Sequence, residues 1–91
     1  MKPIIRQYLA LKREVSADTV LLFRVGPRYR TFDEHEENNL TIPVGRIGEE
    51  VSRLVGLGYT VALADYADTP RPGHLTRREV TRIFSPKKGV Q

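Results

Sequence analysis

The residues of this chain whose types and spacing best suit binding chemistry are arginines. Three arginines and no acid lie between Arg24 and Arg30. Arg28 and Arg30 alternate on one side of an extended segment, where they can grip phosphates or enter a minor groove, in which arginine responds to width and negative potential. The same pattern also suits an edge strand whose charges prevent association with another sheet. The sequence alone leaves both interpretations open.

Tyr29 lies between these two arginines and has two interpretations of its own. Its ring could stack on a base, as aromatic side chains do in proteins that bind single strands. At a strand position, however, a tyrosine more often packs half-buried against the sheet. The first set of candidate DNA-binding residues therefore comprises Arg24, Arg28, Tyr29 and Arg30.

A second set of candidate DNA-binding residues is basic and lies near the C-terminus. Strand alternation predicts that Arg78 and Arg82 share one face and that Arg77 points to the opposite one, so the set cannot line a single groove. A solvated strand face is the alternative to a DNA surface. The members of this set are Arg77, Arg78, Arg82, Lys87 and Lys88.

Other site chemistries find little support in the sequence. His35 and His74 have no ligand spacing, and the absence of cysteine excludes thiolate zinc sites. Asp65, Asp68 and Glu79 could form a carboxylate set for a divalent ion, but a chain of this size encloses little of a cleft. No G-x-x-x-x-G-K-S/T motif occurs, which excludes ATP hydrolysis by this chain. We therefore expect a protein without catalytic activity, metal or cofactor.

The composition is typical of one small globular domain with a basic surplus. The 91 residues are 40% hydrophobic and 29% charged, and the formal net charge is +4. Such a surplus favours polyanionic partners, although many proteins carry a similar one for solubility. The charges are segregated, since residues 71–88 hold six basic residues against one acid, while residues 33–50 hold six acids against Arg46. No apolar run approaches a membrane span and the N-terminus is too charged for a signal peptide, so the cytoplasm is the expected compartment.

Hydrophobic periodicity predicts an α/β fold, a mixed sheet flanked by two or three helices. Helices are expected at residues 3–14, where Pro3 suits the first turn, and at residues 47–55, where Gly58 suits the C-terminal cap. The acidic residues 33–39 could add one or two helical turns. Strands are expected at residues 19–25, 28–32, 40–44, 59–66 and 75–84.

Three local features refine this arrangement. Gly26 and Pro27 should interrupt the strand ladder as a bulge or a turn, because proline cannot donate and glycine bends at little cost. Pro43 confines its own strand to an edge or a bulged position for the same reason. The helix between the third and fourth strands suggests a parallel crossover. We expect a single domain over residues 1–91, with its core at residues 3–86 and a tail at residues 87–91.

Four stretches of the chain, taken in order, carry a resemblance to a known family. They are QYLALK, LLFRVGPRYRTF, EEVSRLVGLGYTVALADYADTP and REVTRIFSPKKG. Together they resemble the N-terminal, mismatch-recognition domain of the MutS DNA mismatch-repair proteins. That domain begins with a QYL-x-LK helix and continues through a strand into Gly-Asp-Phe-Tyr-Glu-x-Phe. It then has a helix followed by VA-x-x-EQ-x-x-DP and ends on a strand like REVVRIVTPG. The resemblance implies a mixed sheet flanked by helices.

The chain departs from the family at the mismatch-recognition motif. In family members that recognise mismatches, the phenylalanine of Phe-x-Glu wedges beside the mispaired base and the glutamate hydrogen-bonds to it. Arg28 and Arg30 occupy these positions here, with Tyr29 kept between them and Pro27 in place of the aspartate. Arginine supplies no rigid apolar wedge and only donates hydrogen bonds, so neither role transfers. Its positive charge should instead raise non-specific affinity for DNA.

The chain is also shorter than the family between Phe32 and Val44, by roughly one helix and a strand. No stretch resembles the remaining MutS domains, including the ATPase, so we expect a stand-alone module. The resemblance implies a non-catalytic DNA-binding module without mismatch specificity. The alternative is a protein-interaction module that docks on a larger repair or replication protein through apolar surface exposed by the shortened region. Self-association through that surface, or through an open sheet edge, is a third alternative.

Overall fold

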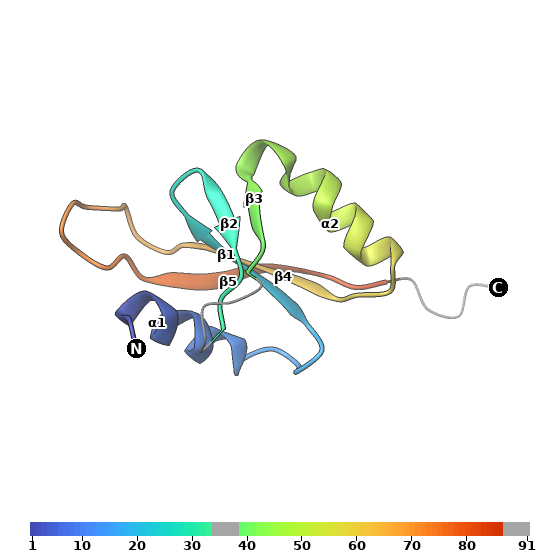
Figure 1. Ribbon diagram of the computed structural model, residues 1–91, viewed down its shortest axis with the longest axis horizontal. Coiled ribbons are helices and arrows are strands. Elements are labelled where there is room, and N and C mark those ends of the chain that lie inside the picture. The colour runs from blue at the N-terminus through green and yellow to red at the C-terminus, as the bar shows by residue number, and fades with distance from the viewer. Residues whose placement is uncertain (34–38, 87–91) are drawn as a thin grey trace.

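The computed structural model describes residues 1–33 and 39–86. These residues form a five-stranded sheet with two α-helices (Figure 1). The elements are α1 (Pro3–Lys12), β1 (Val20–Val25), β2 (Arg28–Arg30), β3 (Thr41–Pro43), a 3-10 turn (Val44–Arg46), α2 (Ile47–Gly56), β4 (Val61–Tyr66) and β5 (Arg78–Phe84). The strand order is β3-β2-β1-β4-β5, with β1 and β4 parallel and the other neighbouring pairs antiparallel. The predicted α/β fold with a mixed sheet is confirmed.

The first helix, α1, forms one layer against the sheet. It begins at Pro3, whose missing N–H costs nothing in the first turn. Its buried residues Ile5, Tyr8 and Leu11 recur at helical spacing, which turns one side of the helix towards the strands. The Tyr8 hydroxyl donates a hydrogen bond to the carbonyl of Leu21 at 3.2 Å. This contact fixes α1 to the central strand.

The central strand, β1, has side chains that alternate between the two faces of the sheet. Leu21 and Phe23 pack in the cluster that contains α1 residues, whereas Leu22 packs with Val51 and Leu54 of α2. Leu21, Leu22 and Phe23 have no accessible surface. The prediction that this strand is covered on both faces is therefore confirmed.

A two-residue turn joins β1 and β2 into a hairpin, because Val25 pairs with Arg28. Gly26 takes a positive φ of 59°, which a residue with a Cβ adopts only with strain, and Pro27 follows with its fixed negative φ. Of the two predicted alternatives, bulge or turn, the structure has the turn. The Pro27 carbonyl accepts a hydrogen bond from the Val44 amide at 2.9 Å, which ties the turn to the end of β3.

One outer strand of the sheet is β3, which contains Pro43. This confirms the predicted edge position, since proline cannot donate to a further neighbour. From β3 the chain passes through α2 to β4, and the pairing directions make β3 and β4 parallel. The predicted crossover is therefore confirmed, although β2 and β1 lie between the two strands it connects. Gly58, with a φ of 99°, follows the end of α2 as predicted.

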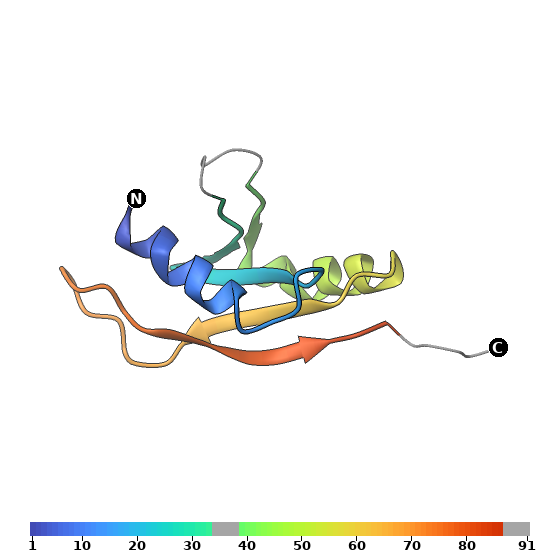
Figure 2. The same ribbon diagram turned by 90° about the horizontal axis from the view of Figure 1, so that it is seen from below.

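The other outer strand is β5, which lies beside β4 along the length of the molecule (Figure 2). It begins at Arg78 instead of the predicted residue 75, because the residues before it belong to the connection from β4, where Leu75 is exposed. The pairing between β4 and β5 shifts at Leu63/Ala64, so Thr81 is an extra residue in β5. This β-bulge was not predicted from the sequence.

Two predictions fall on parts of the chain outside the described residues. The helical turns expected within residues 33–39 lie largely at 34–38, and the expected tail lies at 87–91. A search of the described residues finds no helix that is both long enough and apolar enough to span a membrane.

Candidate nucleic-acid interface

The three residues of β2 point alternately to the two faces of the sheet. Tyr29 faces α2, where it is 5% exposed and packs in one cluster with Leu22 and Ile42. Strand alternation turns Arg28 and Arg30 to the opposite face, and Arg28 is exposed there. The predicted alternation of the two arginines is confirmed. The burial of Tyr29 confirms the packing interpretation of this residue and keeps its ring from stacking on a base.

Aromatic packing anchors Arg30. Its guanidinium lies 4.9 Å from the centroid of the Phe32 ring, and Phe32 packs edge-on against Tyr8 and Phe23. The Nε atom of Arg30 is buried and has no hydrogen-bond partner within the described part of the chain. No carboxylate of residues 1–33 or 39–86 forms an ion pair with Arg28 or Arg30. Within these residues, the two cations are therefore not neutralised by an acid.

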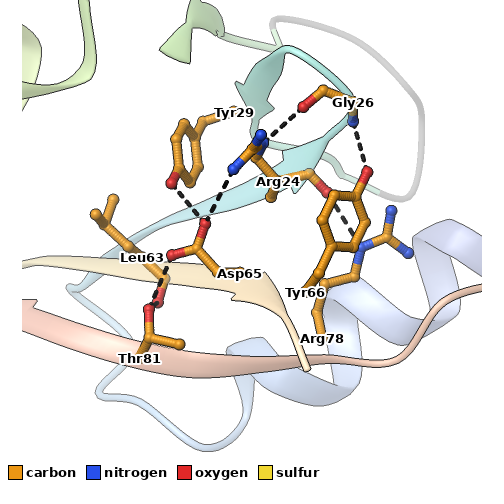
Figure 3. A network of polar contacts seen from close by, with 8 residues as sticks. All are labelled: Arg24, Gly26, Tyr29, Leu63, Asp65, Tyr66, Arg78 and Thr81. Atoms are coloured by element: carbon orange, nitrogen blue, oxygen red, sulfur yellow. Dashed lines mark hydrogen bonds and ion pairs between the residues drawn. The ribbon is translucent and has the colours of Figure 1, made fainter. Parts of the chain in front are cut away.

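The carboxylate of Asp65, in β4, joins the hairpin to the rest of the sheet (Figure 3). The Tyr29 hydroxyl donates to Oδ1 at 2.5 Å, and the Thr81 hydroxyl donates to Oδ2 at 2.9 Å. The Nη1 atom of Arg24 lies 3.7 Å from Oδ1. The side chain of Asp65 is 27% exposed, so this carboxylate connects β1, β2 and β5 at a partly buried position.

The protonation of Tyr29 suits this arrangement. Burial raises the pKa of its hydroxyl above the ordinary value of 10.0, and the hydrogen bond to the Asp65 carboxylate raises it further. The nearby Arg24 acts in the opposite direction but does not cancel these effects. Tyr29 is therefore neutral at physiological pH and can act as the hydrogen-bond donor to Asp65.

The side chain of Arg24 is engaged within the hairpin. Its Nε donates to the carbonyl of Gly26 at 2.6 Å, and its guanidinium carbon lies 5.7 Å from the Tyr29 ring centroid. Together with the ion pair to Asp65, these contacts hold Arg24 across the end of the sheet. The structure thus brings Arg24 and Tyr29 into one cluster, while a contact between Arg24 and DNA stays a prediction.

Tyr66 completes this cluster, although sequence reasoning did not assign it to the site. Its hydroxyl accepts a hydrogen bond from the Gly26 amide at 2.6 Å. Its ring lies 5.6 Å from the guanidinium carbon of Arg24 and 4.8 Å from that of Arg78 (Figure 3). The sequence held one signal for this role. Asp65 and Tyr66 are the polar end of an otherwise apolar strand, where the strand leaves the core.

Arg78 is a buried structural residue, with 7% of its surface exposed. Its Nε donates to the Arg24 carbonyl at 3.1 Å, and its Nη1 donates to the Thr76 carbonyl at 2.8 Å and to Oε1 of Gln7 at 3.2 Å. The interpretation as a solvated strand face is therefore wrong for Arg78. This side chain ties β5 to β1 and to α1.

The prediction that Arg78 and Arg82 share a face of the strand is also wrong. The bulge at Thr81 adds a residue to β5, so Arg78 points towards α1, whereas Arg82 lies in a groove beside α2. Arg82 is exposed, and its guanidinium stacks 4.8 Å from the centroid of the Phe84 ring. Simple alternation failed here because a bulge reverses the orientation of the residues that follow it.

The remaining members of the second basic set do not extend a common surface. Arg77 places its Nε 3.5 Å from Asp68 and its Nη1 3.7 Å from Glu79, so acids offset its charge. Lys87 and Lys88 lie outside the described residues. Their predicted contacts with DNA stay predictions.

The carboxylates considered as metal ligands have other partners in the structure. Asp65 accepts hydrogen bonds from Tyr29 and Thr81, and Asp68 and Glu79 both face Arg77. Among residues 1–33 and 39–86, no three potential ligands come together in a group that could hold a metal ion.

Comparison with family models identifies a match in the first part of the chain. The model described as MutS domain I matches residues 2–39. This part of the chain contains α1, β1 and β2, and therefore the whole hairpin that carries Arg28 and Arg30. The match ends within the segment where the sequence resemblance places the missing elements.

Curated relatives match nearly the whole chain. The DNA mismatch repair protein MutS of Treponema pallidum (strain Nichols) is 32% identical over 105 residues, which cover 98% of this chain and 12% of the relative. The MutS protein of Thermotoga neapolitana is 33% identical over 103 residues, covering 94% of this chain and 13% of the relative. That of Methanothrix thermoacetophila is 31% identical over 109 residues, with the same two coverages of 94% and 13%.

This chain is much shorter than its relatives and is also shorter than the regions with which it aligns. The chain spans 12–13% of the length of the relatives named above. The match to the Treponema protein runs over 105 residues, 14 more than the 91 of this chain, so the relative has residues without a counterpart here. This agrees with the predicted shortening.

Proposed function

Because this chain is a MutS N-terminal-like domain, we propose that it is a non-catalytic DNA-binding module that contacts the DNA backbone and groove shape without selecting mismatched bases. The MutS relatives are DNA mismatch repair proteins by name. For this chain we propose contact with DNA but no recognition of mismatches.

The observation that carries the proposal is the arrangement of Arg28, Tyr29 and Arg30 on the hairpin. Tyr29 is turned inward and held by Asp65, so the two arginines are turned to the opposite face, where Arg28 is exposed. They stand where family members that recognise mismatches carry the phenylalanine and glutamate of Phe-x-Glu. A rigid frame therefore supports two cations at the position of a recognition motif.

The chemistry of these side chains suits contact with phosphate. A guanidinium presents up to five donors in a planar fork that matches the oxygens of a phosphate, and it accepts nothing from a base. Arg30 is pre-ordered by its contact with the Phe32 ring, which lowers the entropy lost when it binds. Affinity that comes from phosphate contacts falls as salt rises, because the cations displace condensed counterions.

A salt titration tests this proposal. Binding should be measured to matched duplexes, to mismatched duplexes and to single strands at several salt concentrations. We expect similar affinity for matched and mismatched duplexes and a steep loss of affinity with salt. The double variant Arg28→Ala, Arg30→Ala should flatten the slope of log K against log salt by about 2, which corresponds to two phosphate contacts.

A matched control separates these two arginines from net charge. The double variant Arg46→Ala, Arg53→Ala removes two exposed arginines near α2 that pair with Glu49 and Glu50. It lowers the net charge equally and should leave most of the salt slope in place. Absence of binding at low salt, or a strong preference for mismatched duplexes, would contradict the proposal.

One observation favours the second candidate, a protein-interaction module that docks on a larger repair or replication protein. Leu40, within the shortened segment, is 43% exposed beside the outer strand β3. Isolated exposed leucines are common on protein surfaces, so this observation weighs less than the arginine arrangement. Failure to bind any nucleic acid at low salt would promote this candidate.

A further inference from the structure

The outer edge of β5 is open, because β5 is the last strand of the sheet formed by the described residues (Figure 2). Such an edge presents unpaired backbone donors and acceptors, which proteins usually protect with charges, prolines or bulges. The opposite edge is a short strand with a proline, Pro43. β5 also carries charges and a bulge, but it is seven residues long and leaves Ile83 58% exposed. The β5 edge is thus the better suited of the two to accept another strand.

The bulge at Thr81 determines how the side chains of β5 are divided between the faces. Val80 packs in the α1 cluster, and Ile83 pairs with Ala62 of that cluster, so both point to the α1 face. The other face of the sheet lies beside α2. The side chains that point to it are those that pair with or contact Leu63, Asp65 or residues packed against Val51 and Leu54 of α2. These side chains are Glu79, Thr81, Arg82 and Phe84.

Antiparallel pairing of β5 with a second β5 requires that opposite residues point to the same face. An unbulged strand would meet this condition in several registers, but the extra residue at Thr81 restricts the choice. One register meets the condition on both sides of the bulge. Its opposing pairs are Thr81 with Arg82, Val80 with Ile83, and Glu79 with Phe84.

This register is chemically complementary on both faces. On the α1 face, two-fold symmetry produces two Val80–Ile83 pairs, which cover the exposed Ile83 with a β-branched neighbour. On the α2 face, the Arg82 guanidinium stacks over its own Phe84 ring and is therefore directed away from the symmetry axis. In this register it would lie near Glu79 of the second copy, which would be opposite Phe84. The two Arg82 side chains would point apart, and each would share a Glu79 that also pairs with Arg77 of its own copy.

We propose that two copies of this chain associate antiparallel along their β5 edges, which joins the two five-stranded sheets into one. The proposal does not depend on DNA binding. In the strand order, β1 and β4 lie between β5 and the strand that carries Arg28 and Arg30, so both hairpins stay accessible in the dimer.

Sedimentation equilibrium of the full chain over a wide concentration range tests the proposal. We expect a reversible monomer–dimer equilibrium. Ile83→Lys places a charge opposite Val80 twice per dimer and should weaken association by about tenfold or more. Leu57→Lys is the matched control, because Leu57 is 64% exposed but lies after α2, away from β5, and should leave association unchanged. A monomer at every concentration, or equal association of the Ile83→Lys variant, would overturn the proposal.

Exchanging the charges tests the register itself. Glu79→Arg brings two arginines together at each Glu79–Arg82 contact, and Arg82→Glu brings two glutamates together, so each variant alone should associate more weakly than the original chain. An equimolar mixture restores opposite charges at both contacts and should form the mixed dimer. Both residues are exposed, and circular dichroism of each variant should confirm folding. If the folded variants stay monomeric in the mixture, the register is wrong.

Discussion

The hydrogen bond between Tyr29 and Asp65 offers a direct test of what holds the hairpin in place. The Tyr29 hydroxyl donates to Oδ1 of Asp65 at 2.5 Å, and Tyr29 is 5% exposed. Hydrogen bonds to charged groups contribute about 1.5–3 kcal/mol. Because the Asp65 side chain is 27% exposed and water can replace part of the contact, the lower end of this range applies. We expect Tyr29→Phe to lower the unfolding free energy by about 1.5 kcal/mol.

A double-mutant cycle isolates this contact from other effects. Asp65→Ala removes the acceptor of Tyr29 and of Thr81 and leaves a buried hydroxyl without a partner, so it should cost about 2–3 kcal/mol. The double variant should cost less than the sum of the two single variants by about 1 kcal/mol, which is the coupling energy of the pair.

Urea unfolding followed by circular dichroism measures all three variants. For a domain of this size, the loss in Tyr29→Phe corresponds to a fall in Tm of roughly 6–12 °C. Tyr59→Phe is the control, because Tyr59 is 48% exposed and its hydroxyl should contribute less than about 0.5 kcal/mol. A coupling energy below about 0.3 kcal/mol would refute the role assigned to the Tyr29–Asp65 bond.

Two further predictions concern the turn and the response to pH. Gly26→Ala should lower the unfolding free energy measured with urea by about 1 kcal/mol, because alanine is strained at a φ of 59°. No atom lies within 4 Å of the added Cβ, so the backbone strain is the whole effect. Gly45→Ala is the control, because Gly45 has the same open surroundings without a positive φ, and this variant should not be destabilised. Burial raises the pKa of both Tyr8 and Tyr29, so their contribution to stability is complete below pH 10 and is lost as the pH rises through their folded-state values. Unfolding free energies measured from neutral pH to above pH 10 should therefore fall at the alkaline end, and less so in Tyr29→Phe; a rise there would contradict the assignment.

Local patterns in the sequence were sufficient to predict the helices and strands and the order in which they occur. The apolar run in β1 predicted a strand covered on both faces, and Gly26 with Pro27 predicted the interruption that became the hairpin turn. Pro43 predicted an edge strand because a missing donor has the same consequence in any sheet. Each of these inferences depends on a few neighbouring residues, whose conformational limits do not change with the rest of the fold.

The contacts that define the candidate site could not be predicted in this way. The bond from Tyr29 to Asp65 spans 36 residues and that from the Gly26 amide to Tyr66 spans 40, so both depend on the parallel pairing of β1 and β4. The burial of Arg78 depends on α1 as well, through Gln7. An arginine near the end of an edge strand gives no local indication that carbonyls from three other segments surround it.

The hydrogen bond between Tyr29 and Asp65 also explains how the residues on either side of Tyr29 can be substituted without a change in the direction in which they point. In a strand, fixing the direction of one residue fixes that of both neighbours, because the period is two. Asp65 and the residues packed against α2 hold Tyr29 on that face of the sheet, so the residues before and after it must point to the opposite face whatever their type. The family motif Phe-x-Glu has the same spacing around its central residue. Replacement of its two outer residues by Arg28 and Arg30 therefore changes what the hairpin can bind, from a base to a phosphate under the proposed function, while Tyr29 keeps the register.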